Sequence, residues 1–192
     1  MFQREKVWIS PEEYLAMEEQ ADHKSEYFNG EIFAMVGASI NHNRITGNIN
    51  AFFNTALARS TCESFASDMR LQVKANGLYT YPDVMVVCGK PEFATGRNDT
   101  ITNPILIVEV LSPSTKNYDR GQKFMLYRAI ETLLDYVLVD QDRPHVEYFH
   151  RLDDGRWILT EFDTMDASLQ LEALQLEIPL SRIYQKVDWQ TE

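Results

Sequence analysis

Residues 105–111, with the sequence ILIVEVL, form a run that is aliphatic at every position except Glu109. A run without polar alternation is typical of a strand covered on both faces in a layered α/β protein. Strand parity places Ile107 and Glu109 on one face and Val108 on the other. An ionised carboxylate in such a strand costs several kcal/mol unless it is paired, protonated or bound to a cation. Glu109 is therefore either part of a functional site or the partner of a structural cation, and the strand pattern weighs the two interpretations evenly.

A second acidic residue stands at the entry of another apolar strand. Pro82-Asp83 precedes the apolar residues 84–87, and proline, which has no N–H for a sheet ladder, marks a strand's beginning or an edge. If the two strands are neighbours, Asp83 and Glu109 bring two carboxylates together. Such groups repel each other unless a cation lies between them, and Mg²⁺ prefers oxygen ligands of this kind. Taken alone, Asp83 is equally well an ordinary turn or cap residue.

Lys123 lies in a helix that is expected to follow the strand carrying Glu109. A short loop would start this helix near the strand's end, so a side chain about 6 Å along it can reach back over the carboxylates. A lysine there could orient a nucleophilic water or neutralise a pentavalent phosphate. The alternative is a solvated helix lysine.

The rest of the chain alternates between helical and extended patterns. A capping box that begins at Ser10 predicts a short helix, and Asn29-Gly30 predicts a tight hairpin turn. The other predicted elements are strands at 25–28 and 31–36, a helix at 41–59, strands in 62–68, 69–75, 78–87 and 105–111, a helix at 119–131 capped by Asp119 and Gln122, a strand at 135–140, a hairpin of 145–150 and 156–162, and an extended tail at 169–178 before a helix led by Pro179. This order predicts a mixed α/β fold in a single domain of residues 1–192.

Charge and composition narrow the classes of protein. The chain has 18 Lys+Arg against 29 Asp+Glu, a net charge of -11, which argues against a protein that coats nucleic acid by bulk charge. The net charge does not exclude nucleic-acid binding at one acidic cleft, because a bound divalent cation would reverse the sign of the charge there. No apolar stretch approaches the roughly 18 residues of a membrane helix, and the polar start argues against a secretory signal. Cys62 and Cys88 are expected to be two reduced thiols, and the expected location is the cytoplasm.

Several segments taken together resemble the Uma-two family of restriction endonucleases, in the PD-(D/E)XK, restriction-endonuclease-like superfamily. The matching positions are 26–31, His42, 81–87, 107–115, 119–123 and 135–140, so the resemblance covers most of residues 10–142. It implies a restriction-endonuclease-like core with a central mixed sheet flanked by helices, to which this chain adds an N-terminal helix and hairpin and a C-terminal β-hairpin. It also implies a divalent metal, usually Mg²⁺ with Mn²⁺ as a substitute, and hydrolysis of phosphodiester bonds.

The same resemblance implies roles for individual residues. Asp83 matches the aspartate of the motif and Glu109 its acidic partner, and the backbone carbonyl of Val110 would be a further metal ligand. Position 111, where the superfamily usually has lysine, is Leu111. Lys123 resembles a replacement for that lysine from a different place in the chain.

Four further residues are secondary candidates. Glu26, opposite Phe33 in the predicted hairpin, either projects toward the cleft and adds a catalytic metal or water contact or is an exposed cross-strand residue. Glu31 is more simply an exposed polar residue. His42, at the start of a helix, is more often a capping residue than a base, and Arg120 is a candidate phosphate contact.

The expected function is a Mg²⁺-dependent endodeoxyribonuclease that acts on nucleic acid, with DNA favoured over RNA and no membrane partner. A homodimer is expected because cleavage of both strands needs two sites. One alternative is a non-catalytic module that keeps the fold and binds nucleic acid or a protein partner, which Leu111 favours. The other is a structural protein in which Glu109 is merely paired in the core.

Overall fold

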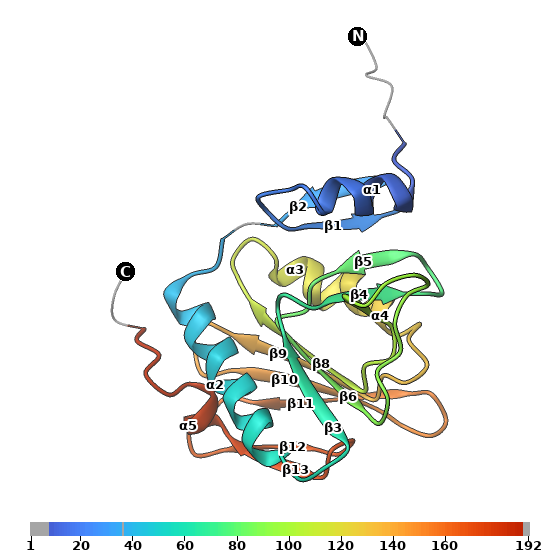
Figure 1. Cartoon of the computed structure of the whole chain (residues 1–192). Coiled ribbons are helices and arrows are strands. Elements are labelled where there is room, and N and C mark those ends of the chain that lie inside the picture. The colour runs from blue at the N-terminus through green and yellow to red at the C-terminus, as the bar shows by residue number, and fades with distance from the viewer. Residues whose placement is uncertain (1–7, 36, 190–192) are drawn as a thin grey trace.

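The structure is a computed structural model that describes residues 8–35 and 37–189 (Figure 1). Its strands are β1 Ser25–Phe28, β2 Glu31–Ala34, β3 Cys62–Ala66, β4 Arg70–Val73, β5 Leu78–Thr80, β6 Val84–Cys88, β7 Thr100–Ile101, β8 Leu106–Leu111, β9 Asp135–Asp140, β10 Val146–Arg151, β11 Trp157–Phe162, β12 Ser168–Leu171 and β13 Leu176–Pro179. Its helices are α1 Pro11–Glu18, α2 Ile40–Ala56, α3 Lys116–Tyr118, a π-helical turn Asp119–Lys123, α4 Phe124–Tyr127 and α5 Leu180–Ile183. The predicted mixed α/β class is confirmed.

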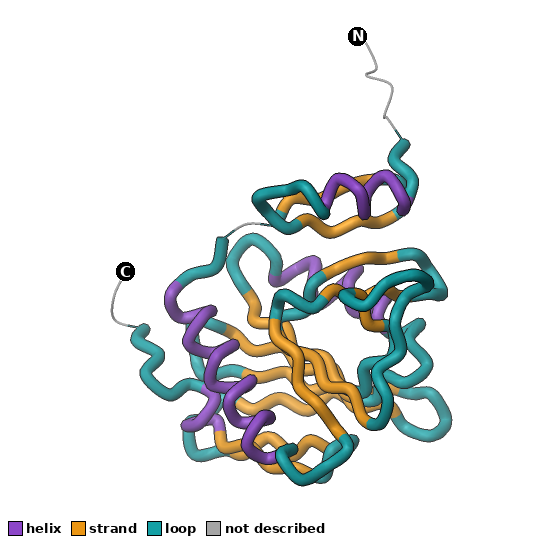
Figure 2. The backbone as a smooth tube through the Cα atoms, in the orientation of Figure 1, coloured by secondary structure: helices purple, strands orange, loops and turns teal. Residues whose placement is uncertain are grey.

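Two sheets contain most of the described strands, which are drawn in orange in Figure 2. The larger has the strand order β11-β10-β9-β8-β6-β3, and the second has the order β2-β1-β5-β4-β7. Strands β12 and β13 form a separate hairpin near the C-terminal end. In the larger sheet β8 pairs in parallel with β9 and antiparallel with β6, so the predicted mixed sheet is present.

Strand β8 lies at the centre of the larger sheet and is buried at every position. Val108 and Val110 face a core formed with α2, α5 and the β12–β13 hairpin. Ile107 and Leu111 face the opposite core, which contains β4, β5 and α4. The alternation predicted from strand parity is therefore confirmed, and both faces of the strand are covered.

The N-terminal elements form as predicted. Ser10 caps α1, because its side chain accepts from the N–H of Glu13 while Glu13 bonds back to the N–H of Ser10. Asn29 and Gly30 both have positive φ, 49° and 81°, as a type I′ hairpin turn requires. The hairpin pairs Glu26 with Phe33, which is the predicted register. Residues 1–7, which include much of the polar start, and residue 36, the last of the predicted strand 31–36, lie outside the described part of the chain.

Two predicted elements are wrong. The predicted strand 78–87 is two strands in different sheets, β5 and β6, because Pro82 interrupts the ladder between them. The helix predicted for 119–131 begins three residues earlier, at Lys116, and ends at Tyr127 as α3, the π-helical turn and α4. Asp119 is therefore not a helix cap: it lies inside the helix and is 3% exposed.

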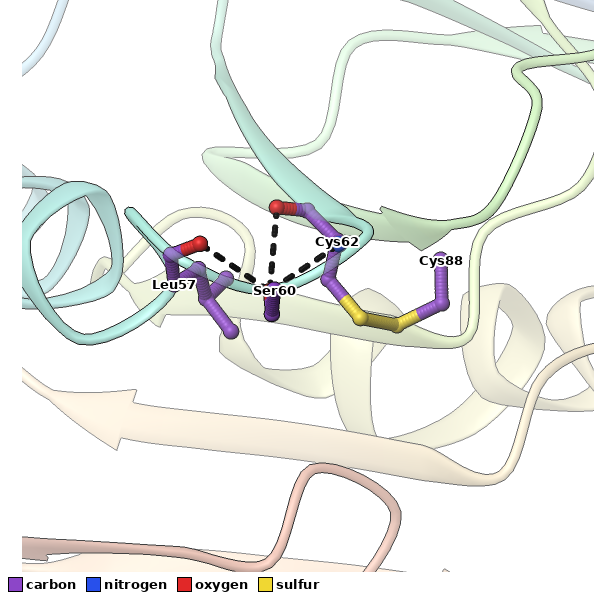
Figure 3. The surroundings of a disulfide bond; sticks show 4 residues. All are labelled: Leu57, Ser60, Cys62 and Cys88. Atoms are coloured by element: carbon purple, nitrogen blue, oxygen red, sulfur yellow. Dashed lines mark hydrogen bonds between the residues drawn. A yellow bond between two sulfur atoms is a disulfide. The ribbon is translucent and has the colours of Figure 1, made fainter.

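The expectation of two reduced thiols is also wrong in this structure. Cys62 and Cys88 lie directly opposite each other on β3 and β6 and form a disulfide (Figure 3). The sequence offered no motif for this pairing, because the two cysteines are 26 residues apart and meet only when the strands pair. No helix in the described residues is long and apolar enough to cross a membrane.

Candidate active site

The antiparallel pairing of β6 with β8 brings the two predicted acids to the same level. Val84 pairs with Val108, so Asp83, one residue before β6, stands beside Glu109. Asp83 Oδ2 accepts a hydrogen bond from the Val110 N–H at 2.8 Å, which ties the aspartate to the neighbouring strand. His42 Nε2, from the first turn of α2, lies 3.2 Å from the same oxygen. Asp83 is therefore held by the backbone N–H of Val110 and by the side chain of His42.

Lys123 is buried among acids. Its Nζ lies 2.9 Å from Glu109 Oε1 and 3.0 Å from Glu26 Oε1. Asp119, one turn earlier in the same helix, places Oδ1 3.6 Å from this nitrogen. The helix that follows β8 thus turns Lys123 back over the end of the strand, where the sequence placed it. The structure brings Glu109, Lys123 and Glu26 together in one cluster.

Glu26 reaches this cluster from the N-terminal hairpin. It is 7% exposed, so the interpretation of Glu26 as an exposed cross-strand residue is wrong, and its catalytic metal or water contact stays a prediction. The Thr80 hydroxyl donates to Glu26 Oε1 at 2.6 Å. Burial opposes ionisation of Glu26, but the Lys123 charge and hydrogen bonds from Thr80 and Tyr118 lower its pKa overall. Glu26 is therefore an ionised partner of the lysine.

The other secondary candidates contact groups other than the Lys123 ammonium. Arg120, next to the cluster in sequence, instead pairs with Glu147, to which its guanidinium lies at 2.6 Å and 2.7 Å. Glu31 is half-buried opposite Phe28 in the hairpin. His42 lies at the site through Asp83 and not through the lysine cluster.

Sequence reasoning missed two residues of the cluster. The sequence pattern predicts Asp119 to be a helix cap, and it gives Tyr127 no role in the site. In the structure the Tyr127 hydroxyl donates to Glu109 Oε1 at 2.7 Å, and Tyr127 is fully buried. The spacing of Asp119, Lys123 and Tyr127 at four-residue intervals was the available signal, because such residues share one helix face.

The surroundings of the cluster shift the pKa values of Glu109 and Lys123. Burial is the main cause that raises the pKa of Glu109 to about 8, the charges of Asp83 and Asp119 act in the same direction, and the Lys123 ammonium opposes them. Burial alone would lower the pKa of Lys123, but the surrounding acidic groups, Glu109 foremost, raise it well above its ordinary value. Lys123 therefore carries a positive charge. The raised pKa of Glu109 means that a further cation beside it would stabilise its ionised form.

The donor set fits a hard divalent cation. Asp83 and Glu109 stand at the same level of two paired strands, and Val110 follows Glu109 in the chain, so the candidate ligands, two carboxylates and one backbone carbonyl, are all oxygen. Among the described residues no group of three or more His, Cys, Asp or Glu side chains could hold a metal. Mg²⁺ does not require one, because it usually binds one or two carboxylates and keeps several waters.

Comparisons with known proteins define the class. A family model described as "Putative restriction endonuclease" matches residues 11–181, and the chain belongs to this family, Uma2. The proteins named "Uncharacterized protein sll1609" and "Uncharacterized protein slr1290" of Synechocystis sp. (strain ATCC 27184 / PCC 6803 / Kazusa) are 40% and 41% identical to it. The first alignment covers 88% of this chain and 95% of the relative, and the second covers 92% and 91%.

A solved structure confirms the fold. The crystal structure of "a putative nuclease belonging to DUF820" from Anabaena variabilis ATCC 29413 matches with a TM-score of 0.75. The match covers 92% of this chain and 97% of that chain at 17% sequence identity. The expected restriction-endonuclease-like architecture is therefore confirmed, and the family and fold together identify the class as nuclease-like.

Proposed function

We propose that this protein is a Mg²⁺-dependent endonuclease that hydrolyses phosphodiester bonds of DNA, with Mn²⁺ able to replace Mg²⁺. The observation that carries the proposal is the buried Lys123 ammonium 2.9 Å from Glu109, at the level where Asp83 stands on the adjacent strand. Two carboxylates and a fixed cation at the end of neighbouring strands suit the binding of a metal and a phosphate together. Membership of the family supports the assignment.

In this proposal Asp83, Glu109 and the Val110 carbonyl hold the metal, which when bound polarises the phosphate and lowers the pKa of a water. Lys123 keeps its proton and donates hydrogen bonds to charge that develops on the phosphate oxygens. Glu26 and Asp119 hold the ammonium in place, at 3.0 Å and 3.6 Å. In the reaction water adds to phosphorus, one P–O bond breaks, and the leaving oxygen takes up a proton.

A second candidate function is a binding module that keeps the carboxylates without turnover. The observation that favours it is the engagement of Lys123 by three acidic side chains, which limits its freedom to meet a substrate. Binding of Mg²⁺ and of DNA without cleavage would identify this function.

We further propose that two copies act together, since cleavage of both DNA strands needs two sites. Analytical ultracentrifugation of the protein alone is expected to show a dimer, and a monomer at micromolar concentration would contradict this part of the proposal.

The protein is proposed to work in the cytoplasm.

Cleavage of a supercoiled plasmid tests the proposed activity. The parent is expected to nick or linearise the plasmid with Mg²⁺ and to stop when the metal is chelated. Asp83→Ala and Glu109→Ala are each expected to lose about 100-fold or more in rate, while Asp163→Ala, at an exposed position, keeps the parent rate. Absence of cleavage of any DNA or RNA by the parent with Mg²⁺ or Mn²⁺ would overturn the enzymatic function.

A further inference from the structure

Two donors meet the same oxygen of Glu109. The Tyr127 hydroxyl donates to Oε1 at 2.7 Å, and the Lys123 Nζ lies 2.9 Å from the same atom. Both donors come from one helix, four residues apart, so they approach the carboxylate from the same side. Both contacts are therefore made with Oε1 and not with the opposite oxygen, Oε2. The carboxylate is thus asymmetric, with one oxygen committed to the protein.

The tyrosine is held firmly enough to fix this asymmetry. Its side chain is fully buried, and its ring packs edge-on against Tyr136 with the ring centroids 5.6 Å apart. Glu109 itself lies in β8, which is buried along its whole length. Neither partner of the hydrogen bond has room to turn away.

We propose that Tyr127 is a positioning residue: by occupying Oε1 of Glu109 it presents Oε2 to the divalent cation. This role rests on the proposed function, because it needs a metal at Asp83 and Glu109. Groups that orient a metal ligand in this way typically change metal affinity 10-fold to 100-fold when they are removed. The hydroxyl acts on the metal only through Glu109.

Tyr136 provides a matched comparison for a merely structural role. It is also fully buried in the same core, and its hydroxyl also makes a buried hydrogen bond, at 3.0 Å to the backbone carbonyl of Asp119. Replacing either tyrosine by phenylalanine removes one oxygen and one buried hydrogen bond. Only the Tyr127→Phe change removes a donor from Glu109.

Isothermal titration of the metal-free protein with MgCl₂ tests the inference without relying on activity. Tyr127→Phe is expected to weaken Mg²⁺ binding about 10-fold, while Tyr136→Phe binds Mg²⁺ like the parent. Both variants are expected to keep the fold, with melting temperatures close to each other. In the Glu109→Gln background Tyr127→Phe is expected to have no further effect on Mg²⁺ affinity, because the hydroxyl then has no carboxylate to orient.

Parent-like Mg²⁺ affinity of Tyr127→Phe would overturn the inference and leave the proposed function intact. An equal loss of affinity in Tyr136→Phe, or loss of the fold in Tyr127→Phe alone, would overturn it as well, because the hydroxyl would then be structural. Failure of the parent itself to bind Mg²⁺ is a different result: it would overturn the proposed metal site, and the role of Tyr127 with it.

Discussion

Lys123 connects stability with the proposed chemistry, because it is the cation that lies among Glu26, Glu109 and Asp119. A buried charge of this kind is costly to desolvate, and its partners become uncompensated if it is removed. Loss of activity in a Lys123 variant is therefore informative only when the fold is measured alongside it.

The substitution Lys123→Met is expected to lower the free energy of unfolding by about 3 kcal/mol, because it leaves three buried acids without their ammonium. Urea denaturation at pH 7 measures the change. Lys116→Met, at an exposed position at the start of the same helix, is the control and is expected to stay within about 0.5 kcal/mol of the parent. Equal stability of the two variants would show that the acids do not depend on Lys123.

Asp99 offers a pH-dependent prediction away from the site. Hydrogen bonds from Arg97, one of them at 2.8 Å, are the main cause that lowers the pKa of Asp99 to about 2. In the unfolded chain an aspartate has a pKa of about 3.9. The contribution of ionised Asp99 to the free energy of unfolding is therefore present above pH ~4 and is lost as the pH falls toward 2.

Asp99→Asn is expected to lower the free energy of unfolding by about 0.5 kcal/mol at pH 7, a small value because 44% of the Asp99 side chain is exposed. The difference from the parent should shrink between pH 4 and pH 2.5, as urea denaturation at several pH values would show. A deficit that grows on acidification would contradict the shift.

The sequence predicted those site residues whose polar side chains interrupt an apolar strand or mark its start. Glu109 was recognisable because a carboxylate interrupts an aliphatic strand, and Asp83 because it follows a proline at a strand entry. Tyr127 was not recognisable, since apolar periodicity counts a tyrosine ring and ignores its hydroxyl. Asp119 resembled a helix cap because nothing local signals that the helix begins earlier, at Lys116.

The site is built from the paired strands β6 and β8, the helix that follows β8, and Glu26 of the N-terminal hairpin. The π-helical turn Asp119–Lys123 contains both the lysine and one of its acidic partners. Single π-helical turns occur frequently at functional sites, and sequence periodicity near 3.6 does not distinguish them from an α-helix. The boundary between β5 and β6 was missed for a related reason, because residues 78–87 have continuous strand propensity apart from Pro82.

The Cys62–Cys88 disulfide is expected to stabilise the protein without affecting the site. It closes a separation of 26 residues, which corresponds to roughly 3 kcal/mol of lost unfolded-state freedom. Cys88 is the last residue of β6 and Asp83 immediately precedes its first, so the two lie about 17 Å apart at 3.4 Å per residue. Reduction with dithiothreitol should therefore lower the urea midpoint and leave Mg²⁺ affinity unchanged.

A thiol assay on the purified, unfolded chain without reductant checks the bond directly. No free thiols are expected. Two free thiols, or equal urea midpoints with and without dithiothreitol, would contradict the disulfide.

In the whole molecule, the nuclease-like class depends on contacts that are distant in sequence. The pairing of β6 with β8 and of β1 with β5 brings together residues of the site that no local pattern connects. The sequence predicted most elements and the alternation of β8, but not this strand order or the second sheet.

The net charge of -11 agrees with a protein whose acids hold a cation in one place and repel the DNA backbone elsewhere. Cleavage is accordingly expected to depend strongly on metal and salt.

The central claim is that Asp83 and Glu109 act as one metal site, and the rates of plasmid cleavage by Asp83→Asn, Glu109→Gln and the double variant test it most directly. Residues that act as a unit have non-additive effects on rate. We predict that each single variant loses about 100-fold or more and that the double variant is little slower than either. Losses that multiply in the double variant, or single variants that cleave with Mg²⁺ at the parent rate, would contradict a shared site.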